Sequence, residues 1–168
     1  ASKPGVYALE RASKAGVPGI VVARKSYAAP EEYDAALLAA LREHRIDVVV
    51  LAGFLSILGP SVITAYPERI LNVHPSLIPS FCGAGYYGLR VHEAALAKGV
   101  KVTGATVHFV NEITDGGDII AQKAVEVLPG DTPETLQRRV MEQAEWILLP
   151  QALEQVAGKI AKKREEKQ

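Results

Sequence analysis

The sequence predicts an α/β fold with a three-layer, mostly parallel sheet whose C-terminal edge is antiparallel. Short apolar runs alternate with amphipathic stretches along the chain, as in proteins that build a sheet from strand–helix units. The run at residues 47–52 is almost entirely apolar, which is typical of a strand buried on both faces. Near the C-terminus, two strand-like segments flank a polar turn with paired glycines, which predicts a hairpin.

The expected helices and strands follow one another in a regular order. The helices carry apolar residues three or four positions apart, and the strands are short and rich in Val, Ile and Thr. Helices are expected at residues 6–15, 31–45, 61–66, 89–98 and from 133 onward. Strands are expected at residues 19–23, 47–52, 101–110 and 119–128, with a further strand that carries Asn72 and His74.

Signals at helix ends support these boundaries. Thr132 is the expected N-cap of the last helix, and Pro133 suits its first position because a proline there loses no helical hydrogen bond. Pro150 should kink or split this helix. The charged tail at 159–168 should fray, and residues 1–158 are expected to form one domain.

Composition and charge narrow the class of protein. The chain has 168 residues, of which 48% are hydrophobic, as is ordinary for a globular domain. Its 19 basic and 19 acidic residues cancel, so no global field attracts nucleic acid or an anionic membrane. No apolar run is long enough to span a bilayer, and no secretion signal is visible. One cysteine, Cys82, excludes an internal disulfide framework and a cysteine-rich zinc site, and predicts a reduced thiol in a cytoplasmic protein.

Two polar residues at the end of a buried strand are candidates for chemistry. Residues of a strand alternate between faces with a rise of about 3.3 Å, so Asn72 and His74 lie on one side about 7 Å apart. Pro75 then ends the strand. The amide can polarise a carbonyl and the imidazole can move a proton near neutral pH. The alternative is a strand end whose polar residues are simply hydrogen-bonded.

The other titratable residues are less informative by spacing alone. Asp115 precedes two glycines, a pattern typical of a tight turn, and spacing does not bring it next to His74. His44, His92 and His108 show no metal-binding pattern with a fourth ligand, and surface or structural roles are expected for them.

Four blocks carry a resemblance to a known family: NVHPSLIP from Asn72, YGLRVHEA from Tyr87, GATVHFV from Gly104 and DGG from Asp115. In this order they closely resemble the glycinamide ribonucleotide formyltransferases, the folate-dependent enzymes of purine biosynthesis. The resemblance runs from Lys3 to about the end of the long helix. The wider family shares the Asn-x-His motif and includes methionyl-tRNA formyltransferase and formyltetrahydrofolate deformylase. The resemblance implies a Rossmann-like, formyltransferase-like fold.

The resemblance also implies a reaction and roles for three residues. The amine of glycinamide ribonucleotide would attack the formyl carbon of 10-formyltetrahydrofolate, the cosubstrate, without a metal. Asn72 would stabilise the tetrahedral oxyanion, and His74 would bind it and shuttle the proton. Asp115 would lie beside His74 and favour the imidazolium.

By the same resemblance, two segments and one catalytic residue would bind the folate. The first segment follows the buried strand, where a core-facing segment is an equally good interpretation, and the second is the loop that ends at Asp115. The expected folate-binding residues are Leu55, Ser56, Ile57, Leu58, Asn72, Val110, Asn111, Glu112 and Asp115.

Several departures from the family pattern stand out. The family begins with a strand and a glycine-rich phosphate loop, which is not visible in this sequence. Three alternatives are open: the molecule contains the loop outside this sequence, the loop is truly absent, or a homodimer partner or another chain supplies it. Pro30 and Asp118 stand where relatives often have a basic residue and a proline, and Ala144 and Glu145 stand where they have a Glu-His pair.

Two alternative functions follow. A hydrolase would pass the formyl group to water, and a folate-binding or structural remnant would not turn over. The balanced charge argues against the tRNA-acting relative and against nucleic acid as a partner.

Overall fold

The computed structural model describes residues 1–166, which form two compact units. The first, here called the N-terminal unit, comprises Ala1–Asp47 and Phe54–Pro67. The second, here called the sheet unit, comprises Val48–Gly53 and Glu68–Gln168. The chain thus passes between the units three times, and each unit is described by itself.

The N-terminal unit consists of helices. They are α1 (Tyr7–Lys14), the 3₁₀ turn η1 (Arg24–Ser26), α2 (Pro30–Glu43) and α3 (Pro60–Ala65). The buried carboxylate of Asp34 on α2 accepts hydrogen bonds from Gly59 N at 2.9 Å and Ser61 Oγ at 3.2 Å. These two donors belong to the start of α3, so Asp34 ties α3 to α2 by satisfying a helix end.

The strand predicted at 19–23 is wrong. The segment is extended, and its hydrogen bonds to the chain start reach only the first two residues. Val22 N and Arg24 N donate to Ala1 O and Ser2 O at 3.0 and 3.1 Å, and Ile20 O accepts from Ala1 N at 2.7 Å. Ile20 and Val21 are exposed. A β-branched run becomes a strand only when a neighbouring strand can pair with its backbone, which the residue pattern does not reveal.

The described residues of the sheet unit contain one four-stranded sheet with the order β1-β2-β3-β4. Its strands are β1 (Val49–Leu51), β2 (Ile70–His74), β3 (Val102–Phe109) and β4 (Ile119–Glu126). The pair β1–β2 is parallel, whereas β2–β3 and β3–β4 are antiparallel. The α/β class and the antiparallel C-terminal edge are therefore confirmed.

The described part of the sheet is mixed rather than mostly parallel, which corrects the prediction. Helix α4 (Leu89–Lys98) lies between β2 and β3 in the sequence, as a parallel crossover would, yet β3 runs antiparallel to β2. Alternation of strands and helices indicates the elements but does not fix the direction of each strand. The helix predicted at 89–98 is confirmed as α4, and Gly99, with φ 74°, ends it.

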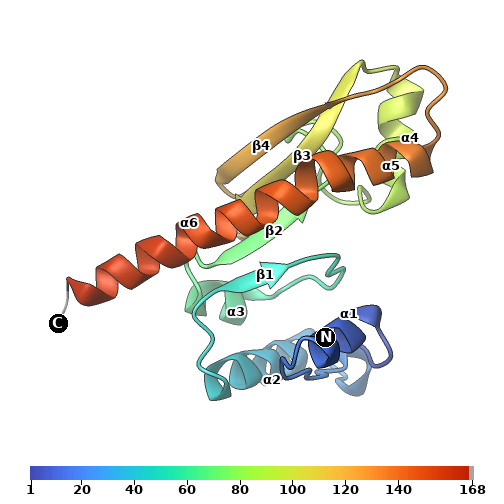
Figure 1. Cartoon of the computed structure of the whole chain (residues 1–168). Helices are drawn as coiled ribbons and strands as arrows, with labels where there is room; N and C mark the ends of the chain where they lie inside the picture. The colour runs from blue at the N-terminus through green and yellow to red at the C-terminus, as the bar shows by residue number, and fades with distance from the viewer. Residues whose placement is uncertain (167–168) are drawn as a thin grey trace. The chain divides into compact units, whose positions relative to one another are not determined.

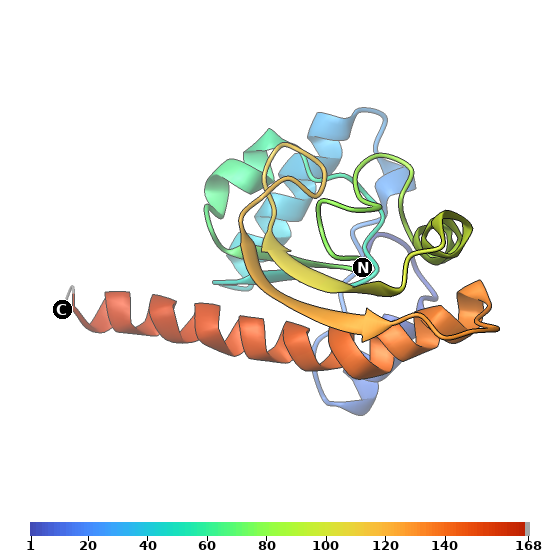
Figure 2. The same ribbon diagram turned by 90° about the horizontal axis from the view of Figure 1, so that it is seen from above.

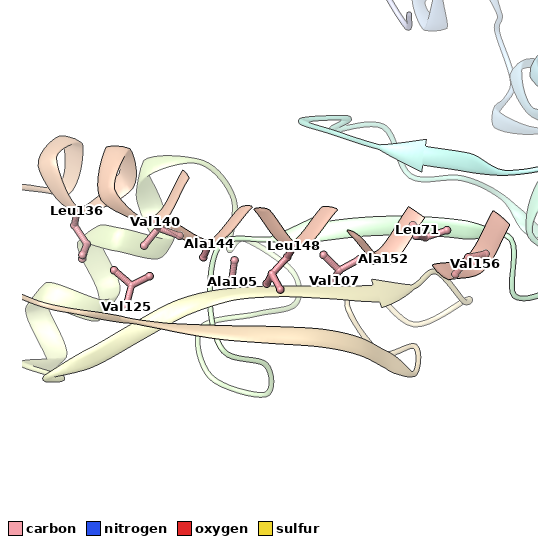
Figure 3. Close-up of a cluster of buried hydrophobic side chains, with 10 residues drawn as sticks. All are labelled: Leu71, Ala105, Val107, Val125, Leu136, Val140, Ala144, Leu148, Ala152 and Val156. Carbon is pink, nitrogen blue, oxygen red and sulfur yellow. The ribbon is translucent and has the colours of Figure 1, made fainter. Parts of the chain in front are cut away.

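A long helix covers one face of the sheet (Figure 1). It consists of α5 (Pro133–Val140), the π-helical turn η2 (Met141–Glu145) and α6 (Trp146–Glu165). Side chains of β2, β3 and β4 pack against it in the hydrophobic core (Figure 3). The buried core residues are Leu71, Ala105, Val107, Val125, Leu136, Val140, Ala144, Leu148, Ala152 and Val156.

The six helical residues of this core, from Leu136 to Val156, recur at every fourth position. In a regular α-helix each step of four would carry the stripe about 40° further round, and five steps would carry it about 200°. The π-helical turn η2 holds about one residue more and turns the following helix back by about 100°. It therefore keeps α5 and α6 facing the same sheet.

The sequence predicts an interruption of the long helix at Pro150. The structure instead has the interruption at η2. Pro150 is the fifth residue of α6, which continues through it. Its missing N–H leaves only the carbonyl of Trp146 without a helical donor. The tail predicted to fray is helical as far as Glu165, and residues 167–168 lie outside the described residues. Thr132 and Pro133 begin α5 as predicted, with Thr132 Oγ1 accepting from Thr135 N at 3.3 Å.

Candidate active site

The candidate site lies on the sheet face opposite the long helix. Because side chains alternate along a strand, the neighbours of Leu71, Ala105 and Val107 point away from the hydrophobic core. Asn72, Thr106 and His108 are among these neighbours, and His74, two residues after Asn72, lies on the same face. Strand register pairs Asn72 with His108 and His74 with Thr106. Figure 2 shows the segment that follows β2 on this side of the β3–β4 hairpin, and the long helix on the other.

Asp115 joins these residues from the turn that follows β3. Its side chain is 10% exposed, and Oδ2 lies 3.5 Å from His74 Nδ1 while Oδ1 lies 3.6 Å from His108 Nε2. Oδ2 also accepts a hydrogen bond from Gly83 N at 2.8 Å. The backbone of Asp115 has φ 55°, a conformation that Asp and Asn tolerate better than most residues. Asp115 therefore belongs both to the turn predicted from the Asp-Gly pair and to the candidate site.

Opposing effects act on the pKa of Asp115. Burial alone would raise this pKa, but the imidazole of His108, the N–H of Gly83 and the charges of His74 and His108 outweigh it. The net result is a pKa below the ordinary value of 3.8. Asp115 is consequently a carboxylate at neutral pH, beside two buried imidazoles.

The hydrogen bonds of His74 fix its tautomer. Nε2 lies 2.9 Å from the carbonyl oxygen of Phe81, which can only accept, so Nε2 carries the proton. In the neutral imidazole, the lone pair of Nδ1 then faces Asp115 Oδ2. The carboxylate, which can only accept hydrogen bonds, therefore lies at the ring nitrogen that is free to take up a proton. This arrangement suits a group that accepts a proton and later returns it.

His108 orients the amide of Asn72. Its Nδ1 donates to the carbonyl of Phe109 at 2.8 Å, which leaves Nε2 of the neutral ring as an acceptor. Asn72 Nδ2 lies 3.1 Å from this Nε2 and donates to it. One N–H of the amide is thereby used for positioning. Within residues 1–166 the second N–H has no hydrogen-bond partner, so it can bind an oxygen atom.

The three residues predicted to carry the chemistry, Asn72, His74 and Asp115, thus lie in one cluster. His108, for which a surface or structural role had been expected, is buried between Asn72 and Asp115. The sequence places His108 on a strand, but it does not show which strand lies beside it. His108 and Asn72 become neighbours only because β2 and β3 pair antiparallel in this register. A bulge between Val107 and His108 also marks the position, as bulges often do beside functional sites.

The predicted folate-binding residues fall in both units. Val110, Asn111 and Glu112 lead from β3 into the turn that carries Asp115. Asn111 shapes this turn, since its Oδ1 accepts from Ile113 N at 2.9 Å and its Nδ2 donates to Gly116 O at 3.2 Å.

The other predicted folate-binding segment belongs to the N-terminal unit. Leu55 and Ile57 are 73% and 85% exposed, and Ser56 is half-buried. Leu58 is buried, so for this one residue the core-facing interpretation holds.

Among residues 1–166, no three His, Cys, Asp or Glu side chains are grouped so that they could hold a metal ion. No helix in this range is long and apolar enough to cross a membrane.

The fold and the polar cluster define an α/β protein equipped to bind an oxygen atom and move a proton at the end of strand β2. The chain belongs to the formyl transferase family, whose family model matches residues 1–153. The trifunctional purine biosynthetic protein adenosine-3 of Gallus gallus is 45% identical over 157 residues, or 94% of this chain and 15% of that protein. The chloroplastic phosphoribosylglycinamide formyltransferase of Arabidopsis thaliana is 49% identical over 105 residues, or 62% of this chain and 36% of the relative.

Solved structures agree with the family and with the Rossmann-like α/β fold. Glycinamide ribonucleotide transformylase 1 from Symbiobacterium toebii superposes with a TM-score of 0.83 at 43% identity, covering 90% of this chain and 69% of that one. Phosphoribosylglycinamide formyltransferase from Brucella melitensis gives a TM-score of 0.83 at 43% identity, with 93% and 77% covered. The chain spans 15% and 36% of the lengths of the two curated relatives described above.

Proposed function

We propose that this chain transfers the formyl group of 10-formyltetrahydrofolate to the amine of glycinamide ribonucleotide. The observation that carries this proposal is the buried cluster in which an oriented amide, an imidazole and a carboxylate meet. The relatives named above as phosphoribosylglycinamide formyltransferases support the choice of substrates. Residues 1–158 would act as one formyltransferase domain.

The geometry suggests how the chain's residues would act. As the amine attacks the formyl carbon, a nitrogen–carbon bond forms and the carbonyl oxygen becomes an oxyanion, which the free N–H of Asn72 would stabilise. His74 would take the amine proton at Nδ1, where Asp115 stabilises the resulting charge. The same proton would return to the folate nitrogen as its bond to the formyl carbon breaks.

We assign folate binding to the segment Leu55, Ser56, Ile57 and Leu58 and to the loop of Val110, Asn111, Glu112 and Asp115, together with Asn72. Exposed apolar side chains, such as Leu55 and Ile57, suit the faces of a flat heterocycle. A cytoplasmic location and an oligomeric partner stay predictions, and one relative is named as chloroplastic.

The test is an assay of formyl transfer with both substrates, following formylated product by mass spectrometry. His74→Ala should abolish transfer, whereas His44→Ala, at an exposed histidine of the N-terminal unit, should retain it. A parallel reaction without the amine measures formate release. Formate without any need for the amine would identify a hydrolase instead, and folate binding without either product would identify a non-catalytic protein.

A further inference from the structure

A single buried hydroxyl lies beneath the candidate active site. Thr106 on β3 is completely buried, and its Oγ1 makes three hydrogen bonds. It donates to Ser76 O at 2.7 Å and accepts from Ile78 N at 3.1 Å and Gln122 Nε2 at 3.0 Å. A hydroxyl has one donor and two acceptor positions, so the capacity of Thr106 is fully used.

Two of these bonds hold the segment that leaves β2, and the third joins Thr106 to Gln122 on β4. Gln122 Nε2 also donates to Ile78 O at 3.0 Å, so both backbone groups of Ile78 are held. Ser76 Oγ, itself completely buried, donates to Ser80 O at 2.5 Å. The backbone from Ser76 to Ser80 is thus attached to β3 and β4 at several points.

The residues directly after this segment hold two members of the site. Phe81 O accepts from His74 Nε2, and Gly83 N donates to Asp115 Oδ2. The positions of both side chains therefore depend on a loop that begins at Ser80. Thr106 and Gln122 attach the segment just before this loop to the sheet.

We propose that Thr106 is a positioning residue of the active site, whose hydroxyl fixes the segment Ser76–Ser80 and thereby sets the places of His74 and Asp115. Thr106 touches no reacting atom. The inference rests on the proposed function for its kinetic consequences, but its structural consequence, the environment of Asp115, is independent of turnover.

The chain offers a matched control. Thr103 lies three residues earlier on β3 and is likewise buried, but within the described protein its hydroxyl has no hydrogen-bond partner. Thr103→Val and Thr106→Val remove the same atom from the same strand and leave a side chain of the same shape. Only Thr106→Val removes hydrogen bonds to the segment that leaves β2.

The experiment measures formyl transfer against pH, together with the titration of the Asp115 carboxyl by carbon NMR, in the full chain. Thr106→Val should lower kcat about 100-fold, the cost expected when reacting groups are misplaced by about 1 Å. It should also raise the pKa of Asp115, because the N–H of Gly83 no longer helps to lower it. Thr106→Ser, which keeps the hydroxyl, should recover most of both properties, and Thr103→Val should resemble the wild type.

Should Thr106→Val fail to fold, Gln122→Met decides, because Gln122 is exposed and its loss removes only the bonds to Ile78 O and Thr106 Oγ1. It should show the same changes to a smaller extent. A folded Thr106→Val or Gln122→Met with wild-type kcat and an unchanged Asp115 titration would overturn the inference. If the wild type transfers no formyl group, the proposed function fails, and the NMR titration still tests Thr106.

Discussion

Within the candidate site, one carboxylate lies beside two imidazoles. Asp115 lies 3.5 Å from His74 and 3.6 Å from His108, and Gly83 adds a backbone donor. His108 in turn holds the amide of Asn72. A substitution of Asp115 therefore affects His74 and His108 directly, and it affects Asn72 through His108.

Asp115→Asn is expected to slow formyl transfer about 100-fold, the lower range for loss of acid–base assistance. Asn suits the backbone φ of 55°, so the turn should persist. The measurement is kcat with both substrates, with Asp118→Asn, an exposed change in the same turn, as control. Equal kcat for wild type and Asp115→Asn would remove Asp115 from the mechanism.

The lowered pKa of Asp115 fixes the sign of its effect on stability. Since the folded-state pKa lies below the unfolded value of about 3.8, the carboxylate stabilises the fold fully above that pH, and this contribution disappears as the pH falls through the folded pKa. The difference in free energy of unfolding between wild type and Asp115→Asn should accordingly shrink in acid.

The candidate residues could be found from the sequence to different extents. The shared face of Asn72 and His74 can be predicted from strand alternation, because residues two positions apart on a strand lie on the same face. The turn at Asp115 follows from its glycines, but its approach to His74 does not, since a contact between residues 41 positions apart depends on how the strands pair. His108 was missed for the same reason.

At the scale of elements, the start of α5 is held by a two-pronged ion pair. Arg139 Nη1 and Nη2 donate to Asp131 Oδ2 and Oδ1 at 2.5 and 2.6 Å, and the two side chains are 19% and 4% exposed. Asp131 also accepts from Leu128 N and Thr135 Oγ1. The pair thereby ties the loop after β4 to α5.

Asp131→Asn should destabilise the protein by about 2 kcal/mol, as expected for hydrogen bonds to a charged group. Hydrogen bonding to Arg139 is the largest cause that holds the pKa of Asp131 well below 3.8, so this stabilisation is complete above that pH and is lost as the pH falls through the lower, folded value. Urea unfolding at pH 7 and pH 3 measures it. Arg138→Gln, which breaks the exposed pair of Arg138 with Glu142, should leave stability close to wild type. Equal effects of the two changes would contradict this account.

Most elements were predictable from local signals, and the failures have a common origin. Thr132, Pro133 and Gly99 mark helix ends through bonds made within a few residues. The segment at 19–23 and the direction of β3 depend instead on distant partners. Pro150 was expected to interrupt the helix, but the four-residue spacing of its buried stripe required the wider turn upstream.

For the molecule as a whole, two titratable groups of the sheet unit oppose each other in their response to pH. His92 on α4 is completely buried, and within the described protein neither ring nitrogen has a hydrogen-bond partner. Burial, with a smaller effect of His74, lowers the pKa of His92 to about 4. Burial raises the pKa of Glu145, in η2, to about 7.

The signs of the two contributions differ. His92 binds a proton more readily when unfolded, so its contribution to stability grows as the pH rises from about 4 to its unfolded pKa of 6.5. Glu145 loses its proton more readily when unfolded, so its contribution is full below 4.5 and is lost as the pH rises through about 7. Between 4.5 and 6.5 the two slopes should largely cancel.

Glu145→Gln should therefore uncover the response of His92. The free energy of unfolding of this variant should rise between pH 4.5 and 6.5 by up to about 1.4 kcal/mol per pH unit, while that of the wild type changes little. Urea unfolding at intervals of half a pH unit is the measurement, with Glu142→Gln at an exposed position of η2 as control. Parallel curves for wild type and Glu145→Gln would refute the cancellation.

The π-helical turn η2 has a consequence for how related chains can differ in length. A turn that already accommodates one extra residue can give that residue up, and the helix on either side would keep its present orientation toward the sheet. Related proteins whose sequences are one residue shorter between Val140 and Trp146 can thus share the same packing. The long helix thus tolerates the loss of one residue, whereas the same loss within a strand would shift the register of that strand.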